Sequence, residues 1–422
     1  MRDTLDVNAG KNRIWGVLGT VLGVLLFVAF LAFLIMRKSA LEEAAEQPHQ
    51  EMSVNSETVE TVDGNAILGF GVESEDNIQN VEDSQVIGEE EALPPNTYLL
   101  PDKETVTFTF AGDVLLDDSY AIMSTYRANG SVLEECIDPA LLEIMRNSDV
   151  FMINNEFPYT NRGTPLANKA FTFRANPANV EILHDMGVDI VSLANNHASD
   201  YGEVSLLDTL DTLENADIPY VGAGRNLEEA SKVVYYQNGD MKIGIVSATE
   251  VERLAIPDTK GATENSPGTF RCFQNDALEE VIRQAKEECD FLIVYVHWGT
   301  ESTDQLDWSQ PGQAEAFTEA GADVIIGAHP HVLQQIDYVN GVPVFYSLGN
   351  YWFNSKSLRS CLVTLEIGEE GLVSARFIPC RTEGSKTVMA VGNEAVSILD
   401  YMRNLSGNVA IDENGYVSEL NP

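Results

Sequence analysis

VIIGAHPH at residues 324–331 runs an apolar stretch straight into two histidines, and four other segments of the chain have the same form. They are TFTFAGD (107–113), VFMINNEFP (150–158), IVSLANNHASD (190–200) and LIVYVHWG (292–299). In an α/β protein, the loops at the carboxyl ends of the strands meet at one crevice. We therefore predict that these five endings form the walls of one site.

The side chains at these endings are of the kinds that bind divalent first-row ions such as Mn, Fe or Zn. A second ion, about 3.5–4 Å from the first, would let one carboxylate bridge both ions and would hold a phosphate-like group between them. Glu156 is the candidate bridge. The sequence thus predicts a centre for one or two divalent transition ions, built from Asp113, Glu156, Asn196, His197, His297, His329 and His331.

Each motif also has a structural interpretation. Gly112 and Asp113 fit a plain turn, and the segment around His197 fits a helix N-cap with a satisfied histidine. The GAHPH segment is the strongest signal, because in an extended segment His329 and His331 would share one face. Four of the six histidines lie in these motifs; His49 and His184 lie elsewhere and receive no role, and His184 is expected at the surface of a helix or at its cap.

The ordered blocks AGD, NNEFP, LANNHASDYG, VHWG, GAHPHV and YSLGNYWF resemble the CapA family of poly-γ-glutamate capsule biosynthesis proteins, a branch of the calcineurin-like metallophosphoesterase superfamily. The resemblance covers residues 106–353. It implies a four-layer α/β/β/α sandwich. For the site it implies metal ligands at Asp113, Glu156, Asn196, His297, His329 and His331, and a general acid or substrate contact at His197. Beside these we assign Asp200 to catalysis with His197, and Asn195, Arg174 and Asn350 to substrate binding.

The first block departs from the superfamily pattern Asp-x-His, because Leu115 stands where the histidine is expected. One metal position would then lack a ligand. Asp117 or Asp118 would compensate if the loop folded back, but we favour solvated turn acids at both positions.

The N-terminal part predicts a membrane anchor. Residues 14–36 carry no charge and, as a helix, exceed the roughly 30 Å of a hydrocarbon core, whereas the apolar region of a signal peptide is shorter. We expect a cytoplasmic tail at 1–13, a single span at 14–36, an acidic disordered linker at 37–102, a main domain at 103–380 and a C-terminal extension at 381–422. The positive-inside bias is slight, but long domains translocate largely regardless of charge. The expected location is therefore the cell membrane, with the N-terminus inside and the main domain extracytoplasmic.

A formal net charge of −41 argues against nucleic acid as a partner, because phosphate backbones need a basic surface. An anionic polymer would likewise need metals or a local basic patch. Arg162, Lys169 and Arg174 form a basic cluster near the motifs, which either lines the rim of the site or is scattered solubilising charge.

Alternation of strands and amphipathic segments predicts repeated βα units. The five cysteines are expected to be buried and free, although a Cys361–Cys380 bridge across a predicted hairpin is an alternative. That hairpin turns at residues 369–371 and precedes a short helix at 394–403 and a loose tail. The expected helices are 139–145, 178–186, 203–214, 276–288 and 313–320, and further strands are 241–248 and 342–350.

Two functions fit these features. The first is a membrane-anchored metallohydrolase acting on an anionic polymer or a phosphoester-like substrate. The second is a non-catalytic, metal-stabilised binding subunit of a polymer synthesis or export complex, with synthase or export subunits as partners. The missing Asp-x-His histidine favours the second function, and the retained histidines favour the first.

Overall fold

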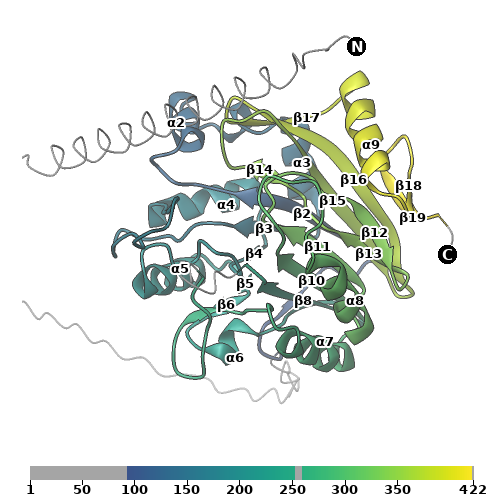
Figure 1. Ribbon diagram of the computed structural model, residues 1–422, viewed down its shortest axis with the longest axis horizontal. Helices are drawn as coiled ribbons and strands as arrows, with labels where there is room; N and C mark the ends of the chain where they lie inside the picture. The colour runs from purple at the N-terminus through teal and green to yellow at the C-terminus, as the bar shows by residue number, and fades with distance from the viewer. Residues whose placement is uncertain (1–92, 252–258, 421–422) are drawn as a thin grey trace, which may run out of the picture. The chain divides into compact units, whose positions relative to one another are not determined.

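Two β-sheets carry the fold in the computed structural model, which describes residues 93–251 and 259–420 (Figure 1). The seven-stranded sheet has the spatial order β1 (Thr97–Leu99), β7 (Val234–Asn238), β8 (Met241–Thr249), β10 (Phe291–His297), β11 (Val324–Ala328), β13 (Val342–Phe345) and β12 (Ile336–Val339). Strands β8, β10, β11 and β13 run parallel. Their carboxyl ends therefore share one edge of this sheet.

The second sheet has ten strands. Its main order is β18 (Val409–Ile411), β19 (Tyr416–Glu419), β16 (Gly371–Glu383), β15 (Leu358–Gly368), β2 (Thr105–Val114), β3 (Val150–Asn155), β4 (Ile190–Ser192) and β5 (Tyr220–Val221). Strand β14 (Asn350–Trp352) pairs with β2, and β17 (Lys386–Met389) pairs with β16. Strands β2 to β5 run parallel. A separate small pair joins β6 (Ala223–Gly224) to β9 (Gly268–Thr269).

Helices cover the outer face of each sheet. Along the ten-stranded sheet lie α2 (Ala121–Ala128), α3 (Pro139–Asn147), α4 (Glu181–Met186) and α5 (Glu203–Asn215), with 3₁₀ turns η1 (Leu133–Glu135) and η2 (Pro177–Val180). Along the seven-stranded sheet lie α6 (Leu227–Ala230), α7 (Asp276–Glu288) and α8 (Gln310–Ala320). A third apolar core lies between the two sheets. The layers therefore run helices, sheet, sheet, helices, and the expected mixed α/β class is confirmed.

Local sequence explains why these elements form. In α7, Leu278, Ile282 and Ala285 are buried at helical spacing, while Arg283 pairs with Glu279 on the exposed side. Strands of the inner core alternate, so that Phe108 and Phe110 of β2 face the seven-stranded sheet. Apolar periodicity thus sets which face each element buries.

The C-terminal residues join the sheet and the inner core. Helix α9 (Asn393–Leu405) buries Ile398, Leu399 and Met402 in the core between the sheets, and β19 pairs with β16 (Figure 1). The expected loose tail is therefore wrong, because Val409, Ile411 and Val417 of the last two strands are buried apolar residues. Residues 381–420 are packed as part of the same unit as the main domain.

The expected hairpin is confirmed as β15 and β16, with Gly371 at the turn in the left-handed region at φ 105°. Cys361 lies in the core between the sheets, whereas Cys380 lies in the core under the helices, so the two thiols are on opposite faces. All five cysteines are buried and free. The Cys361–Cys380 alternative is therefore wrong.

The predicted tail, membrane span and most of the acidic linker lie outside the described residues. Within residues 93–251 and 259–420, no helix has both the length and the apolar character that crossing a bilayer requires.

Candidate metal centre

Parallel strands of both sheets deliver the candidate ligands to one place. Asp113 is the second-last residue of β2 and Glu156 directly follows β3, while Asn196 and His197 lie in the loop after β4. From the other sheet, His297 ends β10, and His329 and His331 follow β11. The five predicted strand endings therefore meet, three from one sheet and two from the other.

The first group of ligand atoms belongs to Glu156, His297 and His329, and these atoms lie within 4.8 Å of one another. His297 Nε2 is 3.0 Å from His329 Nδ1 and 3.8 Å from Glu156 Oε1. The Asn196 side-chain oxygen lies 2.9 Å from the same His297 nitrogen. Two imidazole nitrogens, an amide oxygen and a carboxylate thus converge, as the ligands of a first-row divalent ion do.

The second group contains Asp113, Glu156 and His331. His331 Nδ1 is 2.9 Å from Asp113 Oδ2, and His331 Nε2 is 3.8 Å from Glu156 Oε1. Glu156 is common to both groups. The arrangement therefore matches two neighbouring ion positions that share one carboxylate.

The unpaired oxygen of Glu156 tests whether a cation fits here. Glu156 is fully buried, and its Oε1 has no hydrogen-bond partner among the described residues. A buried carboxylate without a partner is costly unless a cation neutralises it. The same oxygen lies 3.8 Å from a ring nitrogen of each of His197, His297 and His331. The donor set and this orphaned oxygen fit a divalent ion.

Electrostatics of the buried groups agree with that fit. Burial, followed by the nearby Asp113 carboxylate, raises the pKa of Glu156 well above its ordinary value. Burial and the neighbouring histidines lower the pKa of His297 well below its ordinary value and that of His329 to about 3. These two imidazoles are therefore neutral near pH 7, the form that binds metals. Burial opposes the charged form of His331, but the hydrogen bond to Asp113 and the negative charges of Asp113 and Glu301 together outweigh burial and raise the His331 pKa.

The backbone of the GAHPH segment differs from the expected extended form. His329 and His331 have φ angles of 97° and 60°, in the left-handed region that side chains other than glycine rarely adopt. The two rings are therefore aimed at different groups, one toward His297 and one toward Asp113. Strain of this kind gathers at functional sites, where surrounding contacts enforce it.

A buried acid holds His197. Asp200 Oδ2 lies 2.7 Å from His197 Nδ1 and also accepts a hydrogen bond from the Phe173 backbone N–H at 2.6 Å. Lys169 Nζ donates to Asp200 Oδ1 at 2.5 Å and to the Asn196 carbonyl oxygen. With Nδ1 donating to Asp200, the Nε2 of His197 faces Glu156 and the centre of the site.

Three residues have supporting roles that the sequence analysis did not assign. Asn154 Nδ2 lies 2.8 Å from Asp113 Oδ1, 3.3 Å from Glu156 Oε2 and 3.3 Å from His297 Nδ1. Phe173 stacks on His197 with ring centroids 4.2 Å apart. Lys169 was expected either at the rim of the site or as scattered solubilising charge, yet its side chain is 5% exposed. Asn154 stood within the quoted NNEFP block, whereas nothing in the local sequence marks Lys169 or Phe173.

The residues expected to bind substrate are placed differently from one another. Asn195 is buried, and its amide donates to Asn154 and to the Asn155 carbonyl while its oxygen accepts from the His197 N–H. Asn195 therefore holds the loop, and its contact with substrate stays a prediction. Asn350 contacts His331 Nδ1 at 2.9 Å through its oxygen, and its buried Nδ2 has no partner among the described residues. Arg174 is exposed, with its guanidinium 4.6 Å from the centre of the Tyr201 ring.

The acids near the first block do not replace the missing histidine. Leu115 is fully buried in the apolar core under the helices. Asp117 is buried rather than solvated as expected, because it accepts hydrogen bonds from Ser119 and from the Arg174 backbone N–H. Asp118 is paired with Arg127 at the surface. Both acids therefore shape the loop and lie in neither metal-ligand group.

A close backbone approach explains the glycine before Asp113. A Cβ on Gly112 would lie 1.9 Å from the Gly349 carbonyl oxygen, and that oxygen accepts a hydrogen bond from the Asp113 N–H. Only glycine fits such a contact. The segment SLGN at 347–350 is thereby held beside Asp113, which brings Asn350 to His331.

Fold and site together define a mixed α/β protein with a buried candidate centre for two divalent ions. A family model described as bacterial capsule synthesis protein PGA_cap matches residues 107–355, more than half of the chain. The PGA biosynthesis protein CapA of Bacillus subtilis (strain 168) is 31% identical over 276 residues, which are 64% of this chain and 69% of that protein. The capsule biosynthesis protein CapA of Bacillus anthracis is 30% identical over 296 residues, 67% and 69% of the two chains. This chain belongs to the bacterial capsule synthesis family.

Solved structures are less similar. The sulfate thiohydrolase SoxB of Thermus thermophilus aligns with a TM-score of 0.37 at 14% identity, over 74% of this chain and 61% of that chain. A score at this level adds nothing to the assignment.

Proposed function

We propose that this protein is a membrane-anchored, extracytoplasmic, metal-dependent component of poly-γ-glutamate or related surface-polymer synthesis, with a metallophosphoesterase-like hydrolytic site. The observation that carries the proposal is Glu156, whose unpaired buried oxygen is shared by two groups of ligand atoms. Membership in the capsule synthesis family supports a role in polymer synthesis, and the neutral imidazoles support the binding of a metal ion.

In this function the residues of the chain divide into two roles. Asp113, Glu156, Asn196, His297, His329 and His331 would hold the ions, whose identity among Mn, Fe and Zn the ligand set leaves open. Bound ions of this kind polarise a phosphoryl or acyl oxygen and lower the pKa of a water. His197, oriented by Asp200 and Lys169, presents Nε2 to the site and would donate or accept the proton.

The substrate class follows from charge. A centre of two divalent ions attracts an anionic group, and a chain with a formal net charge of −41 gives a polyanion no other broad attraction. An anionic polymer or a phosphoester-like precursor is therefore the proposed substrate. The remaining donor candidates are Arg174 at the surface and the buried, unpaired amide nitrogen of Asn350.

The proposed membrane attachment is supported by the amino-acid sequence. Residues 14–36 hold no charged side chain, and a helix of that length exceeds a hydrocarbon core of roughly 30 Å. The long segment that follows this span supports an outward-facing domain, which would place it beside polymer synthase or export subunits.

Leu115 favours a second candidate function. Because an apolar, buried residue stands at the expected histidine, one ion position has fewer ligands, and a metal-stabilised scaffold that binds polymer without cleaving it would tolerate that loss. His197 separates the two functions, since it contributes a proton rather than holding an ion in the proposed enzyme.

A strain carrying His197→Ala provides the test. For the hydrolytic site we expect the purified full chain to retain its metal while turnover falls by roughly 10²–10⁴-fold and surface polymer is lost. His184→Ala is the matched control, because His184 is an exposed helical histidine away from the centre. Polymer at the normal level, with metal retained in the His197→Ala protein, would refute catalysis and support the scaffold.

A further inference from the structure

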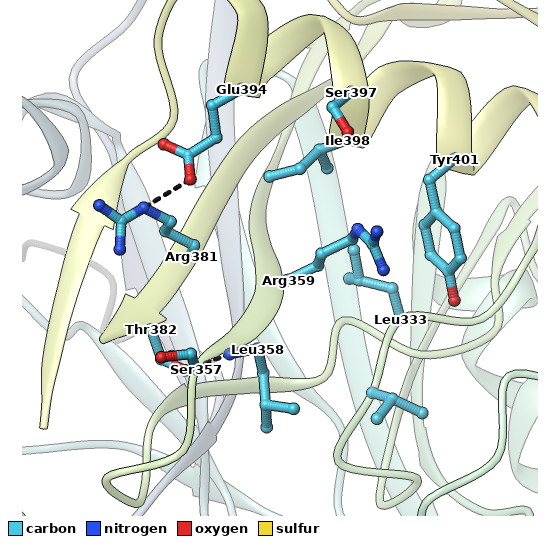
Figure 2. Close-up of a pocket in the computed structure, with 11 residues that line it drawn as sticks. Leu333, Ser357, Leu358, Arg359, Arg381, Thr382, Glu394, Ser397, Ile398 and Tyr401 are labelled. Atoms are coloured by element: carbon cyan, nitrogen blue, oxygen red, sulfur yellow. Dashed lines mark hydrogen bonds and ion pairs between the residues drawn. The ribbon is translucent and has the colours of Figure 1, made fainter. Parts of the chain in front are cut away.

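A pocket of about 440 Å³ lies between α9 and the β15–β16 hairpin, and none of the metal-ligand candidates lines it (Figure 2). One part of its lining is apolar and comes from Leu333, Leu358 and Ile398. The polar part comes from two arginines, one acid, a tyrosine and three residues with aliphatic hydroxyls: Arg359, Arg381, Glu394, Tyr401, Ser357, Thr382 and Ser397.

The two arginines stand directly opposite each other on neighbouring strands. Arg359 of β15 and Arg381 of β16 are partners in the antiparallel register, so their side chains leave the same face of the sheet. Like charges in this position repel. In a chain with a formal net charge of −41, such a pair is a local concentration of positive charge that the overall composition does not predict.

Nearby acids neutralise one member of the pair. Arg381 Nε lies 2.6 Å from Glu394 Oε1, and the same guanidinium pairs with Glu383. Arg359 makes no ion pair with any residue in the part of the chain that the structure describes. Its guanidinium carbon lies 4.3 Å from the centre of the Tyr401 ring, and Figure 2 shows the two side chains facing each other at the pocket.

Tyr401 is itself fixed. Its hydroxyl donates to Asp304 Oδ2 at 3.1 Å, which holds the ring in place for Arg359. A guanidinium stacked on an aromatic ring still has its N–H edge available for a carboxylate. Arg359 is therefore positioned to bind an anion.

The rest of the lining indicates what kind of anion fits. The hydroxyls of Ser357 and Ser397 make no hydrogen bond to any described residue, so they are available to amide groups of a ligand. Leu333, Leu358 and Ile398 offer an apolar surface to methylene groups. A chain that alternates carboxylates, amides and methylenes matches this combination, whereas a bare inorganic anion uses only the arginine.

The pocket also adjoins the loop of the metal centre. Val332 and Leu333 line the pocket and directly follow His331 in the chain. The Val332 carbonyl accepts a hydrogen bond from Ser347, and Leu333 bridges to Leu348, two residues before Asn350. A ligand held here therefore lies against the backbone segment that carries His331.

We propose that this pocket is a carboxylate subsite, in which Arg359 binds a segment of a γ-linked polyglutamate chain beside the metal-binding loop. The inference rests on the proposed role in surface-polymer synthesis and adds to it the residue that holds the polymer. Charge-assisted bonding between guanidinium and carboxylate supplies the affinity, and the serines and the apolar wall supply the preference for a polymer over a free anion.

Calorimetric titration of the full chain in detergent with a short γ-linked oligoglutamate tests the proposal. Arg359→Gln should weaken binding at least about tenfold, because a charge-assisted hydrogen bond is lost. Arg376→Gln is the matched control: Arg376 also lies on this hairpin, over the Tyr416 ring at 5.5 Å, but outside the pocket. The Arg376→Gln protein should bind the oligomer with the same affinity as the unaltered protein. Equal affinity in the Arg359→Gln protein would overturn the proposal.

Two further probes identify the source of the anion. Inorganic phosphate and free glutamate should each bind far more weakly than the oligomer, and equal binding of either would show a simple anion site and overturn the polymer subsite. Thermal unfolding without ligand should be unchanged or raised in Arg359→Gln, since the repulsion with Arg381 is relieved. The oligomer should then raise the Tm of the unaltered protein and leave that of the variant unchanged.

Metal content separates this inference from the proposed function. Arg359→Gln should retain the metal of the unaltered protein, because Arg359 is in neither ligand group. If the unaltered protein bound no metal but bound the oligomer through Arg359, the subsite would stand and the proposed metal function would fall. If metal bound normally and the oligomer did not bind, the subsite would fall alone.

Discussion

Replacing Lys169 by methionine removes the positive member of a buried ion pair and leaves Asp200 charged in the interior. The Lys169 and Asp200 side chains are 5% and 0% exposed, with Nζ 2.5 Å from Oδ1. Breaking a buried pair costs about 3–5 kcal/mol. Asp200 keeps the Phe173 N–H at 2.6 Å and His197 at 2.7 Å, so we expect the lower end, a loss of about 3 kcal/mol in the free energy of unfolding.

Urea unfolding of the solubilised chain measures this loss. Arg162→Met is the control, because Arg162 also pairs with an acid, Asp208, but its side chain is 66% exposed and such pairs contribute little. Asp200→Asn combined with Lys169→Met should recover part of the loss, since both charges are then gone. A Lys169→Met protein no less stable than the Arg162→Met protein would refute the reasoning.

Three further predictions concern the backbone, a buried acid and the thiols. Gly112→Ala should lower the free energy of unfolding by more than about 2 kcal/mol in urea titrations, because its Cβ would lie 1.9 Å from the Gly349 carbonyl oxygen; a smaller loss would show that the loop can move. Burial, and after it the charge of Asp307, raises the pKa of Glu250 from 4.5 to about 7. The protonated side chain therefore contributes to the free energy of unfolding in full below pH 4.5, and this contribution is lost as the pH rises through 7. Between pH 5 and 8 the free energy of unfolding of the unaltered protein should therefore fall by about 2 kcal/mol more than that of the Glu250→Gln protein, after allowance for the partial solvation of Glu250. Parallel plots of unfolding free energy against pH for the two proteins would contradict this. Finally, all five cysteines should be alkylated in denaturant without reductant, as mass spectrometry would show, and fewer modified thiols would indicate a disulfide.

Much of the fold follows from patterns that lie within one element. The helix predicted at 276–288 has those same bounds as α7, since buried positions recur at helical spacing and charged residues fill the rest. The hairpin at 369–371 follows from two apolar runs around a glycine. The strands after α9 were not predicted, because β18 and β19 are short and only β19 pairs with β16, a strand that lies far away in the sequence.

In the candidate site, too, features marked by local sequence were predicted and features set by distant contacts were not. Strand endings rich in carboxylate, amide and imidazole brought Asp113, Glu156 and His297 into one prediction, because parallel strands align their carboxyl ends. The ion pair of Lys169 was not predicted, because Lys169 reaches Asp200 from a loop 31 residues away in the sequence. The left-handed backbone conformation of His329 and His331 was not predicted, because neither residue is a glycine and surrounding contacts impose the conformation.

Metal stoichiometry in single-ligand variants tests the central claim, that Glu156 joins two ion positions. Elemental analysis of the full chain should give two divalent ions, and His184→Ala should keep both because that side chain lies outside the centre. His331→Ala should lose one ion and His329→Ala the other, whereas Glu156→Ala should lose both, since it alone belongs to both groups. A Glu156→Ala protein that retained the metal content of the unaltered chain would contradict the account.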